Sequence, residues 1–341
     1  ENASSSGKAN LRTTEQAFGD QLHSYTIVDA IRDKTVLPFR VDYLNSFRVR
    51  DGIDNHDVEG IDTDSAYMNP QRISAVVSYI LEHFDQKTKR HASFQYKERR
   101  VNGFNSLFAT SSIKAARAYY QEFKRQQADL PEARRLSVGI IYSYAPNAEA
   151  PGTGLLSEES MDPSALSQDD RAFLDEAIAD YNQQFGASFG TDASGFEGYY
   201  TSLSTALAER RIDLVIVVDM FLTGFDSKSL NTLWVDKNLR AHGLIQAFSR
   251  TNRILNSVKT FGNIVCFRNL EEATNDAIAL FGNKEARGQV LLRPYSEYLS
   301  TYLETIEQLR LGFPLPIGSI ASEMEQKRFI DLMGQVLRLR N

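Results

Sequence analysis

Residues 212–218 read IDLVIVV, and Asp213 is the only polar residue among them. A run this short, this apolar and this rich in β-branched side chains predicts a strand that is buried on both faces. Comparable apolar runs occur at Phe104–Thr110, Ser137–Tyr144, Leu230–Val235 and Gly262–Phe267. Because helical stretches separate them, the runs predict one mainly parallel sheet with helices on both faces. The expected fold class is therefore α/β, with an open sheet.

Amphipathic stretches predict the helices of this domain. Ile113–Gln127 carries alanine and aromatic side chains at helical spacing. The passage from 145 to 201 is polar and acidic, and we expect one helix in it, Gln168–Phe185. Leu203–Arg211 predicts a short helix that leads into the strand at 212–218.

The two ends of the chain differ from its middle. The first residues are polar and rich in serine, whereas apolar residues after Gly282 repeat at helical spacing over Tyr295–Ile306 and Ile320–Arg340. We therefore expect a connector at residues 1–20, the α/β domain at 21–284 and the start of a helical domain at 285–341.

Composition excludes several classes of protein. Of 341 residues, 42% are hydrophobic and 24% are charged, as in proteins that form a core rather than stay disordered. No run approaches the ~18 apolar residues of a membrane span, so we expect no membrane partner. The one cysteine, Cys266, excludes an internal disulfide and suits the cytoplasm, which is the expected location. The five histidines lack ligand spacing, and Asp51–Asp64 lacks the order of a calcium loop, so we expect no metal site.

The net charge of −6 is unevenly distributed. Glu149–Asp180 contains nine acidic residues and one basic residue, Arg171. Lys237–Thr260 contains five basic residues and no acidic one. A strip this basic attracts anions, phosphates included, although an ordinary solvated basic face has the same composition.

A possible ligand-binding turn follows the most apolar run. Gly224 allows the backbone to turn tightly, Thr223 offers a hydroxyl, and Asp226 supplies a carboxylate. A plain strand-to-helix turn in which Asp226 caps the helix fits the same residues.

A second cluster follows about twenty residues later. Gln246, Arg250 and Arg253 are spaced i, i+4 and i+7, so on a helix they project from one face. No acidic residue is near them in sequence, and we therefore expect the two guanidinium groups to be available to an external anion. Planar guanidinium groups suit phosphate oxygens.

Together these two motifs resemble motifs V and VI of superfamily 2 helicases and translocases. Asn105–Ser112 (NSLFATSS) resembles motif IV of the same proteins. The sequence of Val217–Arg253 (VVDMFLTGFDSKSLNTLWVDKNLRAHGLIQAFSRTNR) more closely resembles the restriction, or motor (R), subunit of type I restriction-modification enzymes. Ser249 matches the serine of these subunits at a position where many helicases carry glycine. Gln21–Tyr43 resembles the connector that follows the first motor domain of these subunits, and the resemblance covers roughly residues 18–282.

The resemblance implies a RecA-like domain of the P-loop NTPase type, the second motor domain of an ATP-dependent translocase of double-stranded DNA. The Walker A and Walker B motifs and the nuclease motif are not recognisable in the sequence. We therefore expect the first motor domain of a longer subunit to bind most of the ATP and Mg²⁺, and this chain to be inactive alone.

The resemblance also implies roles for single residues. Arg253 and Arg250 would be catalytic, with Arg253 as the arginine finger. The residues expected to contact the nucleotide or the other motor domain are Gln246, Asp226 and Gly224, and those expected to hold DNA phosphates are Ser111, Ser112 and Thr223. The implied partners are the backbone of double-stranded DNA, the first RecA-like domain, and the modification and specificity subunits.

Three alternatives remain open at this point. A generic superfamily 2 helicase domain would share the same motifs. A self-contained Rossmann-type nucleotide-binding or transferase domain would need a glycine-rich loop, for which Gly152-Thr153-Gly154 is a weak match because no strand precedes it. A non-catalytic module could dock a neighbouring subunit through the acidic residues of 149–180.

Overall fold

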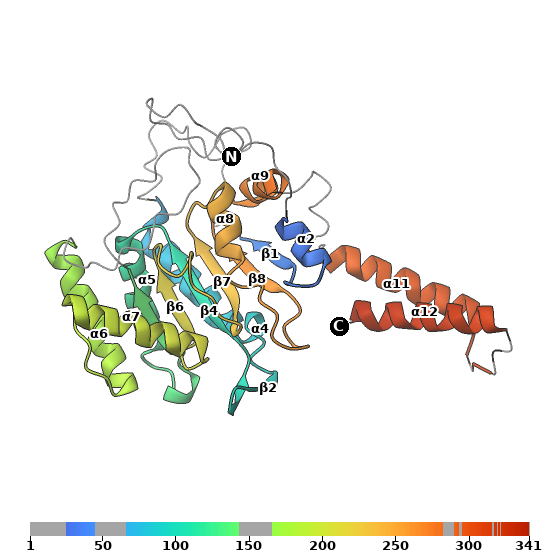
Figure 1. The fold of residues 1–341 in the computed structure, drawn as a ribbon, viewed down its shortest axis with the longest axis horizontal. Coiled ribbons are helices and arrows are strands. Elements are labelled where there is room, and N and C mark those ends of the chain that lie inside the picture. Colours follow the sequence, from blue (N-terminus) through green and yellow to red (C-terminus); the bar gives the residue numbers. More distant parts are fainter. Residues whose placement is uncertain are drawn as a thin grey trace, which may run out of the picture. The chain divides into compact units, whose positions relative to one another are not determined.

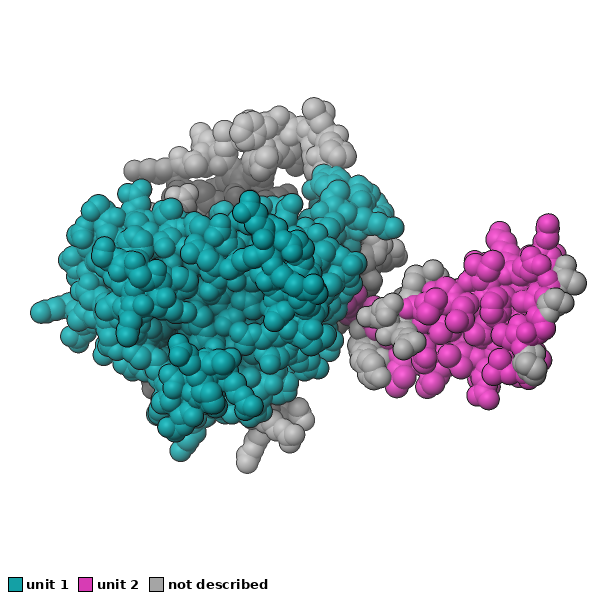
Figure 2. Space-filling view, turned by 90° about the horizontal axis from the view of Figure 1, so that it is seen from below, with its two compact units in different colours: residues 1–291 teal, residues 292–341 magenta. Residues whose placement is uncertain are grey.

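The structure is a computed structural model, and it describes residues 25–44, 66–142, 166–281, 290–292, 295–315, 317–318, 320 and 322–340. The chain divides into two compact units, residues 1–291 and residues 292–341 (Figure 2). The connector expected at 1–20 and the boundary expected after residue 284 lie outside the described residues.

Six parallel strands form the sheet of the first unit (Figure 1). In the order in which they pair, they are β1 (Phe39–Tyr43), β8 (Gly262–Cys266), β7 (Leu230–Asp236), β4 (Asn105–Thr110), β6 (Leu214–Val217) and β5 (Val138–Ile141). Every residue of β4, β6, β7 and β8 is buried, as expected for strands covered on both faces. The predicted open, parallel α/β sheet is confirmed. β1 was not predicted as a strand, because its sequence, FRVDY, lacks the continuous apolar run that identifies the central strands.

Helices connect the strands. They are α2 (Ile27–Arg32), α4 (Pro70–Lys87), α5 (Ile113–Gln127), the short 3₁₀ helix η1 (Glu132–Arg134), α6 (Gln168–Phe185), α7 (Ala193–Ala208), α8 (Ala241–Phe248) and α9 (Glu271–Phe281). α4 packs against α5, and α8 packs against α9. Consistent with this, Gln126 of α5 donates a hydrogen bond to the carbonyl of Ser74 in α4, at 2.9 Å.

Two helices have the bounds that the sequence predicts, and one does not. α5 and α6 begin after Ser112 and Ser167, whose hydroxyls accept hydrogen bonds from backbone amides of the first turn. The expectation of one helix between 145 and 201, with a short helix at 203–211, was wrong. α7 starts at Ala193, capped by Asp192, and its glycines at 195 and 198 hide the helical pattern in the sequence.

Further elements were not predicted: the helices α2, α4, η1 and α9, and an antiparallel hairpin of β2 (Ser93–Tyr96) and β3 (Arg99–Asn102). In the second unit, α11 (Tyr295–Gly312) and α12 (Glu323–Arg340) run side by side (Figure 1). The rings of Phe313 and Phe329 meet edge to face, 5.1 Å apart. No described helix is both long enough and apolar enough to cross a membrane.

Candidate functional site

The β6–β7 loop, residues 218–229, connects two parallel strands and therefore has to cross the length of the sheet. Near its start, Asp219 Oδ1 accepts a hydrogen bond at 2.6 Å from Nζ of Lys237, which directly follows β7. Near its end, the carbonyl of Ser229 accepts a hydrogen bond at 3.2 Å from the amide of Asn105, the first residue of β4. The loop thus begins at the carboxyl edge of the sheet and ends at the amino edge.

Two residues of this loop have left-handed backbone conformations. Gly224 has φ = 70° with open space around it, and so makes the tight turn that the sequence suggests. Phe221 has φ = 67°, which is strained for a bulky side chain. Its buried ring contacts the rings of Tyr200 and Phe225, with centroids 5.2 and 4.9 Å apart, and this packing holds the strained backbone in place. The loop leads into β7 and not into a helix, so Asp226 does not cap a helix.

The prediction that Gln246, Arg250 and Arg253 share one helix face was wrong. α8 ends at Phe248, and the arginine turn, residues 249–253, follows it. The amide of Arg250 bonds to the carbonyl of Ala247, at 3.2 Å, so the backbone tightens instead of continuing as an α-helix. The hydroxyl of Thr251 donates to the carbonyl of Phe248, at 2.8 Å, and occupies an acceptor at the end of the helix. Only Gln246 therefore lies on α8.

The arginine turn nevertheless contacts the β6–β7 loop directly. Arg250 donates from Nη1 to the carbonyl of Phe225, and from Nε to the carbonyl of Gln246 at 3.2 Å. Arg253 Nε donates to Asp226 Oδ1 at 2.9 Å. The expectation that no acid accompanies these arginines was therefore wrong for Arg253, whose partner is 27 residues away in sequence.

The Arg253–Asp226 pair lies at the surface. The two side chains are 48% and 58% exposed. An ion pair this open to water contributes only ~0–1 kcal/mol to stability, because water and salt screen it. An incoming phosphate with a higher charge can therefore compete with Asp226 for the guanidinium of Arg253.

The remaining predicted residues have separate positions. Gln246 is half-buried, with Nε2 2.8 Å from Nε2 of His242. Ser111 and Ser112 follow β4 at the carboxyl edge of the sheet, and the Ser112 hydroxyl accepts a hydrogen bond from the amide of Ala115, at 3.2 Å. Thr223 is half-buried in the β6–β7 loop. The structure thus brings Asp226, Arg250, Arg253 and the backbone of Gln246 together. Thr223 and Gly224 precede Phe225, whose carbonyl Arg250 binds, and among the described contacts none joins Ser111 or Ser112 to this group.

Two lysines of the basic strip are buried, contrary to what their sequence context suggests. Lys237 bonds to Asp219, as described above. Lys259 is 1% exposed, and burial lowers its pKa to about 7. Sequence spacing gave no sign of either burial, because the contacts that cover them come from distant parts of the chain. The exposed basic surface of this strip is accordingly smaller than its composition indicates.

A buried ionic network lies at the carboxyl end of β7, and the sequence gave no indication of it. Both carboxylate oxygens of Asp236 are bound by Arg72, at 2.6 and 3.0 Å. Arg268 Nε donates to Oδ1 at 3.1 Å, and Tyr119 Oη donates to Oδ2 at 2.6 Å. Burial alone would raise the pKa of Asp236, but the hydrogen bond from Arg72 and the charges of Arg268 and Arg72 hold it below its ordinary value. The network joins α4, α5, β7 and the residues after β8.

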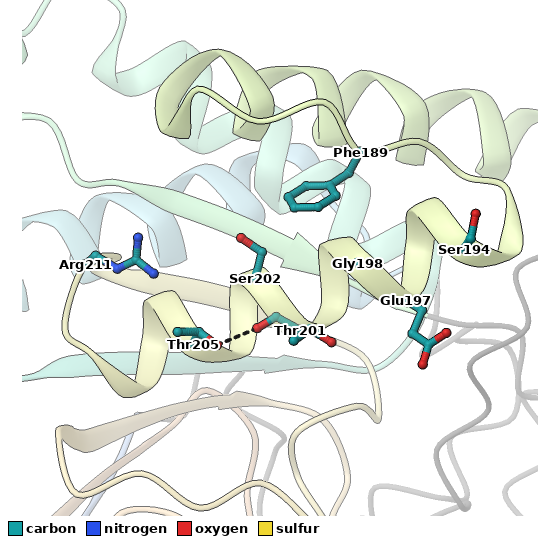
Figure 3. Close-up of a pocket in the computed structure, with 8 residues that line it drawn as sticks. All are labelled: Phe189, Ser194, Glu197, Gly198, Thr201, Ser202, Thr205 and Arg211. Carbon is teal, nitrogen blue, oxygen red and sulfur yellow. Dashed lines mark hydrogen bonds between the residues drawn. The ribbon is translucent and has the colours of Figure 1, made fainter.

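An open groove of about 560 Å³ runs along α7 (Figure 3). Its floor consists of small residues of α7, among them Gly198 and Ser202, with Phe189 above them and Arg211 at one end. None of the predicted site residues lines this groove. The arginine turn and the β6–β7 loop therefore form the candidate site.

Comparison with known proteins identifies the family. A family model described as type I restriction enzyme subunit R domain 3 matches residues 102–269. The chain is also 36% identical, over 350 aligned residues, to the SauCOLORF180P endonuclease subunit of a type I restriction enzyme from Staphylococcus aureus strain COL. This chain belongs to the family of type I restriction enzyme R subunits. The alignment covers 100% of this R-subunit chain and 35% of the staphylococcal relative, so the chain spans about a third of the length of such relatives.

Solved structures are similar to this R-subunit chain at low sequence identity. A fragment assigned as the HsdR subunit of a type I restriction enzyme from Vibrio vulnificus YJ016 is 12% identical, with a TM-score of 0.45, covering 78% of this chain and 38% of that one. Domain 2 of the DEAD-box helicase Mss116p, bound to an RNA duplex, is 11% identical, with a TM-score of 0.33, covering 89% of this chain and 86% of that one. The first unit of this chain has an α/β fold built on a six-stranded parallel sheet.

Proposed function

We propose that this chain is the second motor domain of an ATP-dependent double-stranded DNA translocase within a type I restriction endonuclease. The observation that carries the proposal is the direct contact between the β6–β7 loop and the arginine turn. Arg250 binds the carbonyl of Phe225, and Arg253 pairs with Asp226, so the two motifs form one surface. Membership of the R-subunit family supports this assignment.

The chemistry of this surface fits a phosphate. In phosphoryl transfer, negative charge develops on the transferred group, and a positioned guanidinium stabilises it. Arg253 is exposed enough to reach an external anion, and Asp226 holds it in place until that anion arrives. Arg250, anchored on two backbone carbonyls, would keep the loop and the turn in register and form the second phosphate contact. Gln246 and Gly224 border the same surface.

ATP and Mg²⁺ would be held mainly by the first motor domain of the complete subunit. ATP supplies the phosphoryl group whose transfer drives movement. The residues of this chain bind and orient its phosphates: Arg253 and Arg250 donate hydrogen bonds, and Asp226 orients Arg253. The donors are arginines with permanent charge, so their phosphate contacts persist over the physiological pH range.

DNA would contact Ser111 and Ser112 at the carboxyl edge of the sheet, and Thr223 on the β6–β7 loop. Ser112 caps α5, and the amides at the N-terminus of a helix favour phosphate oxygens. Ser111 and Thr223 add hydroxyl groups, and contacts of this kind read the DNA backbone rather than the base sequence. The β6–β7 loop starts at the carboxyl edge and carries both Thr223 and Asp226, so this one segment would link DNA contact to nucleotide contact as the two motor domains close and open. The modification and specificity subunits would complete the enzyme.

The DNA contacts predict a selective loss of coupling. Ser111→Ala and Thr223→Ala in the complete subunit should weaken DNA stimulation of ATP hydrolysis and slow translocation, while basal hydrolysis stays near wild type. The reason is that each change removes a phosphate contact without touching the arginine turn. The measurement is ATPase rate with and without duplex DNA. The matched control is Ser78→Ala, which changes a half-buried serine of α4 whose hydroxyl donates to Glu82 Oε1 at 3.1 Å. Equal loss of basal and stimulated rates would contradict the assignment.

Because the proposal assigns most of the nucleotide and Mg²⁺ binding to the first motor domain, it predicts that the isolated chain has no ATPase activity. Purified alone, it should show no DNA-stimulated ATP hydrolysis above background, because the groups expected to bind Mg²⁺ and most of the nucleotide are on the first motor domain. This prediction would be contradicted if the pure chain hydrolysed ATP and the Arg250→Ala change abolished that hydrolysis. Tight binding of a fluorescent ATP analogue by the isolated chain would instead favour the Rossmann-type alternative.

A further inference from the structure

Lys259 is a buried lysine that has no role in the mechanism above. Its Nζ donates to the carbonyl of Lys228 at 3.0 Å and to the carbonyl of Leu230 at 2.6 Å. Oδ1 of Asn256 accepts hydrogen bonds from the amides of Val258 and Lys259, at 3.1 Å each, and so fixes the backbone from which the side chain leaves. The ammonium therefore fastens together two segments whose bonded residues are 29 positions apart.

The two segments are those that carry the exposed ion pair. Lys228 follows Asp226 by two residues, and Lys259 follows Arg253 by six. We propose that Lys259 is a positioning residue for the Asp226–Arg253 pair, because its ammonium fixes the spacing between the segments that carry the two side chains. This inference rests on the proposed function, in which Arg253 meets a phosphate.

Stability alone does not account for a charge at this position. Burial lowers the pKa of Lys259 to about 7, while the charge of Asp226 opposes this lowering and that of Arg253 adds to it. A methionine of similar length would fill the space without the cost of burying an ammonium. A phosphate that arrives at Arg253 brings negative charge and favours the protonated amine. Charge-assisted hydrogen bonds are stronger than neutral ones, so the two segments are held most firmly when the ligand is bound.

The test uses Lys259→Met in the complete subunit. We expect kcat for ATP to fall ~10–100-fold, the effect of a small misplacement of a catalytic group. The melting temperature should stay near that of wild type, since the change removes the cost of a buried charge together with the hydrogen bonds to the carbonyls of Lys228 and Leu230. Lys228→Met is the matched control, because it removes an exposed ammonium at the same place and leaves the carbonyl that accepts from Lys259. Its kcat should stay near wild type. A melting temperature that falls in step with kcat would show a merely structural role and overturn the proposal.

A double-mutant cycle separates this inference from the function on which it rests. In an Arg253→Ala background, Lys259→Met should cause no further loss of kcat, because no arginine remains to be positioned. Independent, multiplicative losses would overturn the positioning role while leaving the proposed function intact. Near-normal ATPase in Arg253→Ala alone would overturn the proposed function itself, and the inference with it.

The pH profile gives a second readout. The charged groups around Lys259 are Asp226 and Lys228 on the loop, Arg253 on the turn, and Lys89 after α4, whose Nζ donates to the carbonyl of Val258 at 2.7 Å. As pH rises through and above about 7, Lys259 loses its proton and the holding contact weakens. The kcat of wild type should therefore decline over this pH range, whereas that of Lys259→Met should not show this decline, so the ratio of the two kcat values should fall. Parallel profiles for the two proteins would contradict the proposal.

Discussion

Arg253→Ala in the complete subunit should remove most ATP turnover, by ~10³–10⁵-fold, while folding and DNA binding stay nearly intact. The size follows from the charge that a trans-acting arginine stabilises in the transition state of phosphoryl transfer. Folding should survive because the pair that Arg253 forms with Asp226 is about half exposed and contributes ~0–1 kcal/mol. The measurements are steady-state ATPase, DNA binding by filter or gel assay, and thermal unfolding.

Two further variants make this prediction specific. Arg253→Lys should lose nearly as much ATPase activity as Arg253→Ala, because an ammonium keeps the charge but lacks the planar arrangement of donors. Arg134→Ala is the matched control, since Arg134 is an exposed arginine of the 3₁₀ helix η1, far in sequence from both motifs. If Arg253→Ala kept about half the ATPase rate, a catalytic contribution of several kcal/mol would be excluded. Arg253 would then serve only as a surface partner of Asp226.

Hydrophobic patterning was sufficient to predict the centre of the sheet. Its buried strands are short apolar runs, and a run that is apolar on both faces has few other places in a soluble domain. Amphipathic patterning was likewise sufficient for α5 and α6, whose first turns are capped by Ser112 and Ser167. β1 was missed because it lacks a continuous apolar run, and the first half of α7 was missed because two glycines obscure the helix.

The arrangement of the candidate site depended on contacts that local patterns do not encode. A spacing of i, i+4 and i+7 indicates one face only if the helix continues, and α8 ends before Arg250. The partner of Arg253 comes from the β6–β7 loop, and the acceptors of Lys259 come from the same loop and the start of β7. The sequence therefore predicts which chemical groups the site contains, but the arrangement of strands and loops determines which of them are in contact.

Asp236→Asn should lower the free energy of unfolding of this chain by ~3–5 kcal/mol, the cost of leaving a buried charge without its partner. Asp236 is 1% exposed and is the acid to which both Arg72 and Arg268 bond. Asparagine has nearly the same shape, but it carries no charge and turns an amide group toward those donors. Urea unfolding measures the loss. Arg32→Ala is the control, because its pair with Asp29 is exposed and should cost less than ~1 kcal/mol.

The pH dependence of this loss has a definite sign. The pKa of Asp236 is below its ordinary value, so its stabilising contribution is present at neutral pH and disappears only as pH falls through that lowered value. The difference in free energy of unfolding between wild type and Asp236→Asn should therefore become smaller at acidic pH.

Charge balance predicts a smaller effect for Arg268→Met. One acid faces two arginines here, and removing Arg268 leaves the bidentate Arg72–Asp236 pair neutral and hydrogen-bonded. The change also removes a cation–π contact, since the Arg268 guanidinium lies 3.9 Å from the centre of the Tyr67 ring. That contact is worth ~0.5–2 kcal/mol. Arg268→Met should therefore cost less than Asp236→Asn. If Arg268→Met and Asp236→Asn lowered the free energy of unfolding equally, the number of hydrogen bonds, and not the balance of charge, would determine the stability of this network.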